Sequence, residues 1–160
     1  MSLTDAQLQT LKTDIAASEF GALPQNSDSA FEIAAAYNLD GVPDFTVWQD
    51  FVNLQEVGDA LDGVDLGNMT SANSERLRTF GVMNPLGTKP TRADHRAFFD
   101  DVFSGAGGAT TRANLDLLWK RLATRTEALL ATGTGSTGSP GTMEFVGNIN
   151  YRDVLNAWAA

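Results

Sequence analysis

Residues 111–131 read TRANLDLLWKRLATRTEALLA, and this stretch is expected to decide the fold. Its apolar seam consists of Leu115, Leu118, Leu122 and Leu129, with Trp119 beside them. Apolar residues spaced three, four and seven apart lie on one face of an α-helix. The spacing therefore predicts a helix over about residues 111–131, which would be the longest of the chain and the centre of its core.

The polar face of the same stretch is basic. It carries Arg112, Lys120, Arg121 and Arg125. On one continuous helix these side chains would form a basic stripe. Such a stripe is either a solvated face or the counterpart of an acidic surface on a neighbouring copy.

Capping signals predict further helices before this stretch. A Ser, Thr or Asn followed three residues later by Glu or Gln satisfies two free backbone N–H groups at a helix start. The predicted helices, with their caps, are about 5–18 (Thr4 and Gln7), 29–38 (Ser29 and Glu32), 53–61 (Asn53 and Glu56), 70–82 (Thr70 or Ser71) and one opened by Thr91 and Asp94. Residues 42–52 are predicted to be a short extended piece or an irregular helical turn, and residues 62–69 a loop.

The C-terminal part of the chain differs in composition. Residues 132–142, TGTGSTGSPGT, contain only Gly, Ser, Thr and Pro, which predicts a mobile loop or arm. Residues 143–146 are predicted to be a short strand, and Asn150 with Asp153 to cap a final helix. Trp158 near the chain end indicates docking, either on the chain's own core or on a neighbour.

Together these patterns predict a mainly α, single-domain helical bundle with a short β element near the C-terminus. Residues 1–131 would form the helical core, 132–142 the Gly/Ser/Thr-rich arm, and 143–160 a docking strand and helix. The length of 160 residues suits one domain.

Composition excludes several functions. The net charge of −9 opposes binding to phosphate backbones or anionic membranes, and the absence of Cys excludes disulfides and thiolate chemistry. No apolar run approaches the roughly 18 residues of a membrane span, and the start of the chain lacks the pattern of a signal peptide. We therefore expect synthesis in a cytoplasm and no membrane partner.

The charge is unevenly distributed. Residues 1–70 hold twelve acidic side chains and one basic one, a net charge of −11, whereas residues 71–160 hold eight acidic and ten basic ones, a net charge of +2. Complementary faces of this kind can bring successive subunits together. The alternative is that folding mixes the two parts and the surface potential averages out.

His95 is the only imidazole and follows Asp94. Adjacent residues on a helix point in different directions, so a packing or surface role is expected over general-base or metal chemistry. Residues 104–108, SGAGG, are expected to be a turn between helices, because the phosphate-loop pattern is absent. The acidic stretch around Asp59, Asp62 and Asp65 lacks the spacing of a calcium loop. No catalytic residue, cofactor or metal site is predicted.

Three stretches carry a family resemblance. They are LTDAQLQTLKTDI at residues 3–15, AFEIAAAYNLDGVPDFTVWQ at 30–49, and RAFFDDVFSGAGGATTRANLDLLWKRLATRTEALLATGTGSTGSPGTMEFVG at 96–147, followed by NYRDV. Together they resemble small proteins encoded among the head and tail morphogenesis genes of tailed bacteriophages. The resemblance implies a virion structural protein without enzymatic activity, made in the host bacterial cytoplasm.

Within that class, the size and helical character are similar to those of head-to-tail adaptors, or connectors, that form a dodecameric ring under the portal. The resemblance implies a homo-oligomer that contacts the portal and other head or tail proteins, with incidental contact to DNA in a channel. The expected subunit interface comprises Arg112, Lys120, Arg121, Arg125, Met143, Phe145 and Trp158. Alternatives are a neck, tail-completion or capsid-decoration protein, a small cytoplasmic regulator, or an enzyme that uses His95.

Overall fold

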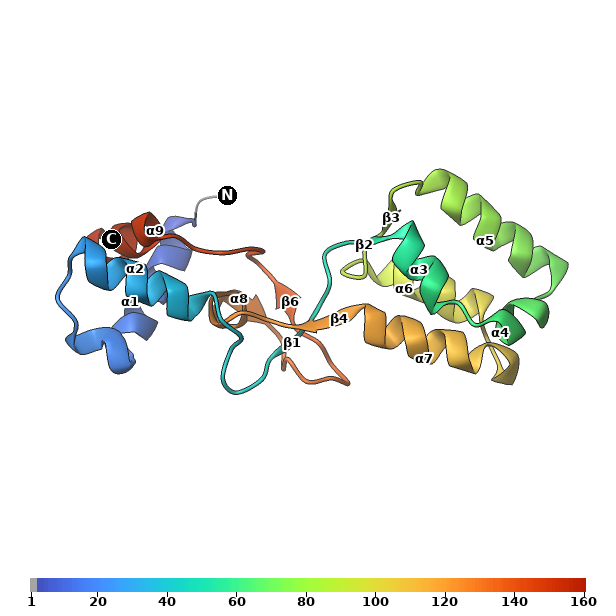
Figure 1. Ribbon diagram of the computed structural model, residues 1–160, viewed down its shortest axis with the longest axis horizontal. Helices are drawn as coiled ribbons and strands as arrows, with labels where there is room; N and C mark the ends of the chain where they lie inside the picture. The colour runs from blue at the N-terminus through green and yellow to red at the C-terminus, as the bar shows by residue number, and fades with distance from the viewer. Residues whose placement is uncertain (1–2) are drawn as a thin grey trace. The chain divides into compact units, whose positions relative to one another are not determined.

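The structure is a computed structural model that describes residues 3–160, and helices predominate in it (Figure 1). This confirms the predicted mainly α fold. The helices are α1 (Asp5–Ala17), α2 (Ser27–Tyr37), α3 (Leu54–Ala60), α4 (Gly63–Gly67), α5 (Ser71–Met83), α6 (Ala93–Val102), α7 (Ala109–Leu118), α8 (Arg125–Leu130) and α9 (Tyr151–Ala159), with 3-10 turns η1 (Glu19–Ala22) and η2 (Ala106–Gly108).

The strands are short and pair two by two. They are β1 (Thr46–Trp48), β2 (Val52–Asn53), β3 (Gly87–Thr88), β4 (Lys120–Leu122), β5 (Ala131–Thr132) and β6 (Thr142–Met143). β1 pairs with β4, β2 with β3, and β5 with β6. The extended conformation predicted within residues 42–52 is therefore confirmed.

The chain forms two compact units. Unit 1 comprises Met1–Val47 and Leu122–Ala160, and unit 2 comprises Trp48–Arg121. The chain leaves unit 1 within β1 and returns to it within β4. The segment boundaries predicted after residues 131 and 142 both fall inside unit 1.

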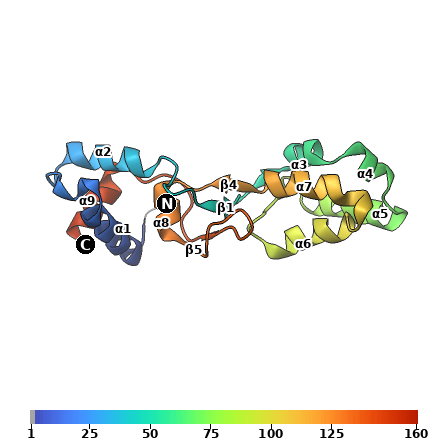
Figure 2. The same ribbon diagram turned by 90° about the horizontal axis from the view of Figure 1, so that it is seen from below.

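The core of unit 1 is built where α9 packs against α1 and α2 (Figure 2). α1 begins at the predicted Thr4–Gln7 capping box, and α9 begins at the predicted Asn150–Asp153 box. Their inward faces meet those of α2, and the main buried side chains are Leu11, Ile15, Ile33, Tyr37, Phe145, Ile149 and Val154. Trp158 packs against this core, so the C-terminal helix docks on its own unit.

Unit 2 packs α3, α6 and α7 around a second core. Its largest buried side chains are Val52, Phe99, Val102, Phe103, Leu115 and Trp119. The antiparallel pair of β2 and β3 places Val52 opposite Thr88. α5 packs against α6 but contains no fully buried residue, which leaves much of its surface exposed to solvent.

The predicted helix over 111–131 is wrong. α7 ends at Leu118, β4 follows, and α8 begins only at Arg125. The second start has a clear cause, because Thr124 and Glu127 form a complete capping box. The leucine spacing is continuous across the break, so periodicity alone predicted one helix where the chain makes two.

Other predicted boundaries also need correction. α2 begins earlier than predicted, at Ser27, because Asn26 caps it in place of Ser29. Residues 63–67 form α4 rather than a loop, since Asp62 accepts hydrogen bonds from the backbone N–H groups of Val64 and Asp65. α6 follows Arg92 with no side-chain cap, so Thr91 does not open it.

The Gly/Ser/Thr-rich segment is the tip of a β-hairpin. β5 and β6 pair Ala131 with Met143 and Thr132 with Thr142. The hairpin is also bound to β1, because Thr46 N–H donates to Gly135 O at 2.6 Å and Gly141 N–H donates to Thr46 O at 2.8 Å. Composition predicted a mobile arm, but backbone hydrogen bonds from a distant segment hold it in place.

Candidate functional site

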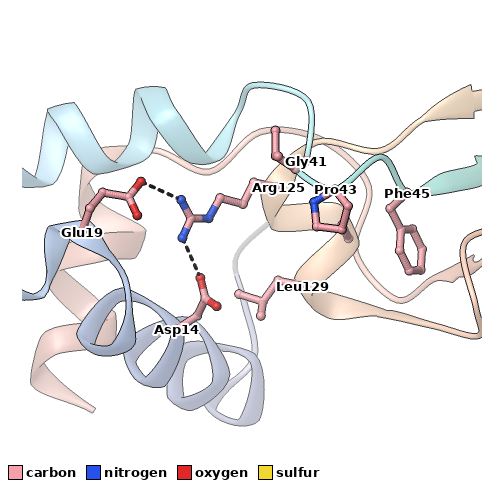
Figure 3. A pocket seen from close by; sticks show the side chains of 9 residues that line it. Asp14, Glu19, Gly41, Pro43, Phe45, Arg125 and Leu129 are labelled. Carbon is pink, nitrogen blue, oxygen red and sulfur yellow. Dashed lines mark hydrogen bonds and ion pairs between the residues drawn. The ribbon is translucent and has the colours of Figure 1, made fainter.

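Unit 1 contains a pocket of about 470 Å³ (Figure 3). α1 contributes Asp14, η1 contributes Glu19, and α8 contributes Arg125 and Leu129. The loop after α2, residues 41–45, forms the remaining wall. Charged groups thus lie at one end of the pocket, and apolar groups of the loop and of α8 line the other.

Arg125 is the centre of the charged end. Its Nη2 lies 3.3 Å from Asp14 Oδ2, and its Nη1 lies 3.1 Å from Glu19 Oε1 (Figure 3). The guanidinium carbon lies 4.3 Å from the centre of the Tyr37 ring, and the Tyr37 hydroxyl donates to Asp14 Oδ2 at 2.5 Å. These interactions join α1, η1, α2 and α8 through one side chain.

The protonation states follow from these contacts. Burial, followed by the hydrogen bond to Asp14, raises the pKa of Tyr37. A backbone hydrogen bond, together with Arg125, lowers the pKa of Glu19. For Arg125, burial lowers the pKa but Tyr37, Glu19 and Asp14 outweigh it, so the net shift is upward. At neutral pH the arginine and Glu19 are charged and the tyrosine is protonated.

This arrangement suits anchoring better than proton transfer. The Tyr37 proton is held by Asp14, and the two guanidinium nitrogens are each engaged by a carboxylate. A general base would need a pKa near the working pH and a free position facing a substrate. The network therefore fixes α8 against α1 and supports the pocket wall.

Val42 and Pro43 line the pocket and are exposed, and Leu39, which is outside the pocket lining, precedes them in the chain and is exposed as well. We call Leu39, Val42 and Pro43 the Val42 rim; Val42 is 93% exposed and Leu39 is 67% exposed. The Val42–Pro43 peptide bond is cis. Exposed Asp40 lies between Leu39 and Val42 along the chain, and exposed Asp44 follows Pro43.

A second exposed apolar surface lies on unit 2. We call Val82, Met83 and Leu86, at the end of α5 and in the turn that follows it, the α5 tip. Their side chains are 73%, 75% and 78% exposed, respectively. Lys89 follows the tip and is also exposed. Clustered apolar side chains at this level of exposure mark interaction surfaces.

His95 is a buried packing residue. Its Nδ1 accepts a hydrogen bond from Lys89 N–H at 3.2 Å and lies 3.0 Å from Thr88 Oγ1, and its ring packs edge-on against Phe80. Burial, followed by the charge of Arg92, lowers its pKa. The structure thus confirms the predicted packing role.

Asp94 does not orient His95. It pairs with Arg92 at 2.5 Å, and that hydrogen bond lowers the pKa of Asp94 to about 2. The neighbouring carboxylate is therefore committed to a different partner.

The glycine-rich turn is closed by the protein's own groups. Buried Asp65 accepts a hydrogen bond from Thr111 N–H at 2.7 Å, within the first turn of α7, and Arg112 donates to Phe103 O and Gly105 O. A carboxylate already occupies the helix start where an anion would bind. Residues 104–108 form the predicted turn between helices.

The predicted basic stripe does not exist as one helix face. Arg112 lies on α7, Lys120 and Arg121 lie on β4, and Arg125 lies on α8 in the other unit. Lys120 pairs with Asp116 at 2.6 Å, and Arg112 is bound to the glycine turn. The cause is the break at Trp119, which places the four cations on three elements.

The apolar residues of the predicted interface lie within unit 1. Phe145 is buried in the core, Trp158 packs against that core, and Met143 is half-buried in β6. Their side chains contribute to the folding of their own unit. Sequence reasoning missed the Val42 rim and the α5 tip, two groups of exposed apolar side chains.

A sequence signal for the two surfaces exists. Both combine apolar residues with a proline at a helix end, in LDGVPD at 39–44 and VMNPL at 82–86. Such residues do not belong to the apolar face that helix periodicity predicts to point inward. Apolar side chains close to a proline at a helix end therefore merit attention as candidate contacts.

Comparison of the chain with protein-family models, curated proteins and solved structures finds no match. Within residues 3–160, no helix has the length and apolar character to cross a membrane. In the same residues, no group of three or more His, Asp or Glu side chains is arranged to hold a metal ion. The functional assignment therefore depends on the site geometry and on the sequence resemblance.

Proposed function

We propose that this chain is a non-enzymatic structural subunit of a tailed-phage particle, acting as a head-to-tail adaptor or connector in a ring under the portal. The observation that carries the proposal is the pair of exposed apolar surfaces, the Val42 rim on unit 1 and the α5 tip on unit 2. A subunit within an assembly needs at least two such contacts, because each copy must meet neighbours on different sides.

The polar groups support the same role. Arg125 with its carboxylates, Asp65 with the α7 start, and His95 with Lys89 each stabilise the fold. The partners of the chain would be copies of itself, the portal, and other head or tail proteins, and its location would be the virion after synthesis in the bacterial cytoplasm.

A quantitative protein census of purified virions, combined with a particle reconstruction, tests this proposal. We expect a fixed copy number and density for the chain at the head-to-tail junction, with rotational symmetry. A phage carrying a stop codon in this gene should accumulate heads and tails that do not join. Absence of the chain from purified particles would refute the proposal and favour a cytoplasmic regulator.

The same experiment separates the structural alternatives by position. A capsid-decoration protein would lie over the head surface in many copies, and a neck or tail-completion protein would lie below the adaptor position. An enzymatic role makes a different prediction. His95→Ala would then abolish biological function while particles still assemble and the variant chain remains folded.

A further inference from the structure

The α5 tip is apolar because of how α5 is packed. α5 contacts α6 through Leu77 and Phe80, and the Phe80 ring stacks on Phe98 at 4.5 Å between centroids. The last turn continues past this contact, so Val82 and Met83 extend into solvent. The turn to β3 then adds Leu86, which gives three largely exposed apolar side chains within residues 82–86.

The Val42 rim is held in position from beneath. Gly41 N–H donates to Ala123 O at 3.0 Å, and Gly41 itself is buried against α8. On the far side of the rim, Thr46 is bound to the hairpin. Val42 is therefore a nearly fully exposed side chain on a backbone that is fixed at both ends, which is the form of a preorganised contact.

The charges beside the two surfaces are opposite. Beside the α5 tip, Lys89 is exposed, whereas the other three cations of residues 71–92 are each paired with a carboxylate, in the pairs Arg76–Asp101, Arg78–Glu75 and Arg92–Asp94. Residues 39–44, which include the rim, hold two acidic side chains and no basic one. Within residues 3–160, Lys89, Asp40 and Asp44 make no ion pair.

The two units are both net negative, but unit 1 is the more acidic. Unit 1 has ten acidic and three basic side chains, a net charge of −7, and unit 2 has ten acidic and eight basic ones, a net charge of −2. A basic group on a partner is thus drawn to unit 1, and Lys89 beside the α5 tip supplies one. Charge complementarity of this kind selects and orients a partner.

We propose that the α5 tip of one copy docks on the Val42 rim of a second copy, with Lys89 facing Asp40 and Asp44. The biological role of this contact rests on the proposed structural function. That the partner is a second copy of the chain is argued from the matching apolar and charged groups of the two surfaces. The contact joins different surfaces of the two copies, so repeating it produces a closed ring or an open filament.

Measurement of self-association tests the inference. Sedimentation velocity of the full chain over a wide concentration range should show a mass that rises with concentration. Met83→Ser and Val42→Ser should each weaken association by about tenfold or more, as truncation at the centre of a contact does. Leu117→Ser is the matched control, because Leu117 is 76% exposed on α7 and lies outside both surfaces.

A mixing experiment identifies the geometry of the contact. The Met83→Ser chain keeps an intact rim, and the Val42→Ser chain keeps an intact tip. A mixture of the two should form a one-to-one dimer that does not grow further. Failure of the mixture to associate, while the wild-type chain associates, would overturn the pairing of tip with rim.

Charge exchange provides an independent test. Lys89→Glu should weaken association, Asp44→Lys should do the same, and the double variant should regain at least part of the loss. Association of the wild-type chain should also weaken as salt rises. A chain that stays monomeric at all concentrations, or associates equally well with Met83→Ser, would overturn the inference.

The two proposals can fail separately. If the isolated chain is monomeric but a virion census finds it at the head-to-tail junction, the structural function stands and the tip-to-rim contact is wrong. If the chain self-associates as described but is absent from virions, the contact stands and the phage role is wrong.

Discussion

Alanine at Gly135 or Gly141 is expected to destabilise unit 1, because the ring of Phe45 lies directly against both glycines. A Cβ at Gly135 would lie 2.3 Å from Phe45 Cδ2, and a Cβ at Gly141 would lie 2.4 Å from Phe45 Cε1. Gly135 also has φ +64°, a backbone conformation that disfavours side chains. Gly138 lies in the same segment and has open space around it.

The magnitude follows from these distances. Non-bonded carbon atoms prefer a separation of about 3.5–4.0 Å, so the ring would have to move by more than about 1 Å. Overpacking of this kind costs about 1–3 kcal/mol, which is the expected loss for Gly141→Ala. Gly135→Ala adds about 1–2 kcal/mol for the left-handed backbone. Gly138→Ala should change stability by less than about 0.5 kcal/mol.

Urea unfolding of the three variants measures these differences, and amide exchange reports where they arise. The N–H groups of Thr46 and Gly141 bind the hairpin to β1, so they should exchange faster in Gly141→Ala. In a Phe45→Ala background the clash disappears. The cost of Gly141→Ala should then shrink, which is a coupling that a double-mutant cycle quantifies.

Two results would refute this reasoning. Equal stability of Gly141→Ala and Gly138→Ala would show that the ring does not constrain the hairpin. An unchanged cost of Gly141→Ala in the Phe45→Ala background would show that the loss has another origin. The first result would fit the mobile arm that the composition predicts.

Three further predictions concern buried groups. Burial and the charge of Arg92 lower the pKa of His95 in the folded chain. Below about pH 6.5 the unfolded chain therefore binds a proton more readily than the folded chain, so the free energy of unfolding falls as the pH falls. His95→Asn should flatten this pH dependence in urea titrations between about pH 5 and 7. Asp65→Ala should cost about 1–3 kcal/mol in urea unfolding, because it leaves the buried N–H of Thr111 without its acceptor. Phe145→Ala should cost about 3–5 kcal/mol, measured by calorimetry, through loss of packing in the core of unit 1.

Each of these predictions has a control in the chain. Asn in place of His95 keeps an acceptor near Lys89 N–H, so an unchanged pH dependence would exclude the histidine as its source. Asp65→Asn retains an oxygen and should cost less than Asp65→Ala. Val146→Ala, at a half-exposed neighbour of Phe145, should cost less than about 1 kcal/mol; an equal cost at both positions would contradict the assigned burial.

Local structure could be predicted from the sequence where a few neighbouring residues determine it. The Thr4–Gln7, Asn53–Glu56 and Asn150–Asp153 capping boxes all form as predicted. Each box is complete within four residues, so no distant part of the chain can easily override it. The Thr124–Glu127 box is equally complete, but the leucine spacing that runs across it predicts one continuous helix.

The candidate site was much less predictable. Nothing local indicates that Arg125 meets Asp14 and Glu19, which lie more than a hundred residues away along the chain. The predicted basic stripe failed for the same reason, since one break at Trp119 assigns neighbouring cations to different units. Whether the Val42 rim and the α5 tip are buried or exposed depends on how the helices pack.

The amino-acid sequence by itself determined the mainly α character of this protein, most helix starts, the packing role of His95 and the acidic balance, because these depend on composition and on neighbouring residues. Tertiary structure decided that residues 111–131 divide between two units, that the Gly/Ser/Thr segment is tied to β1, and that the exposed apolar surfaces lie at residues 39–43 and 82–86. The physical reason is that burial and hydrogen bonding between distant segments outweigh local propensity, and only the folded chain brings those segments together.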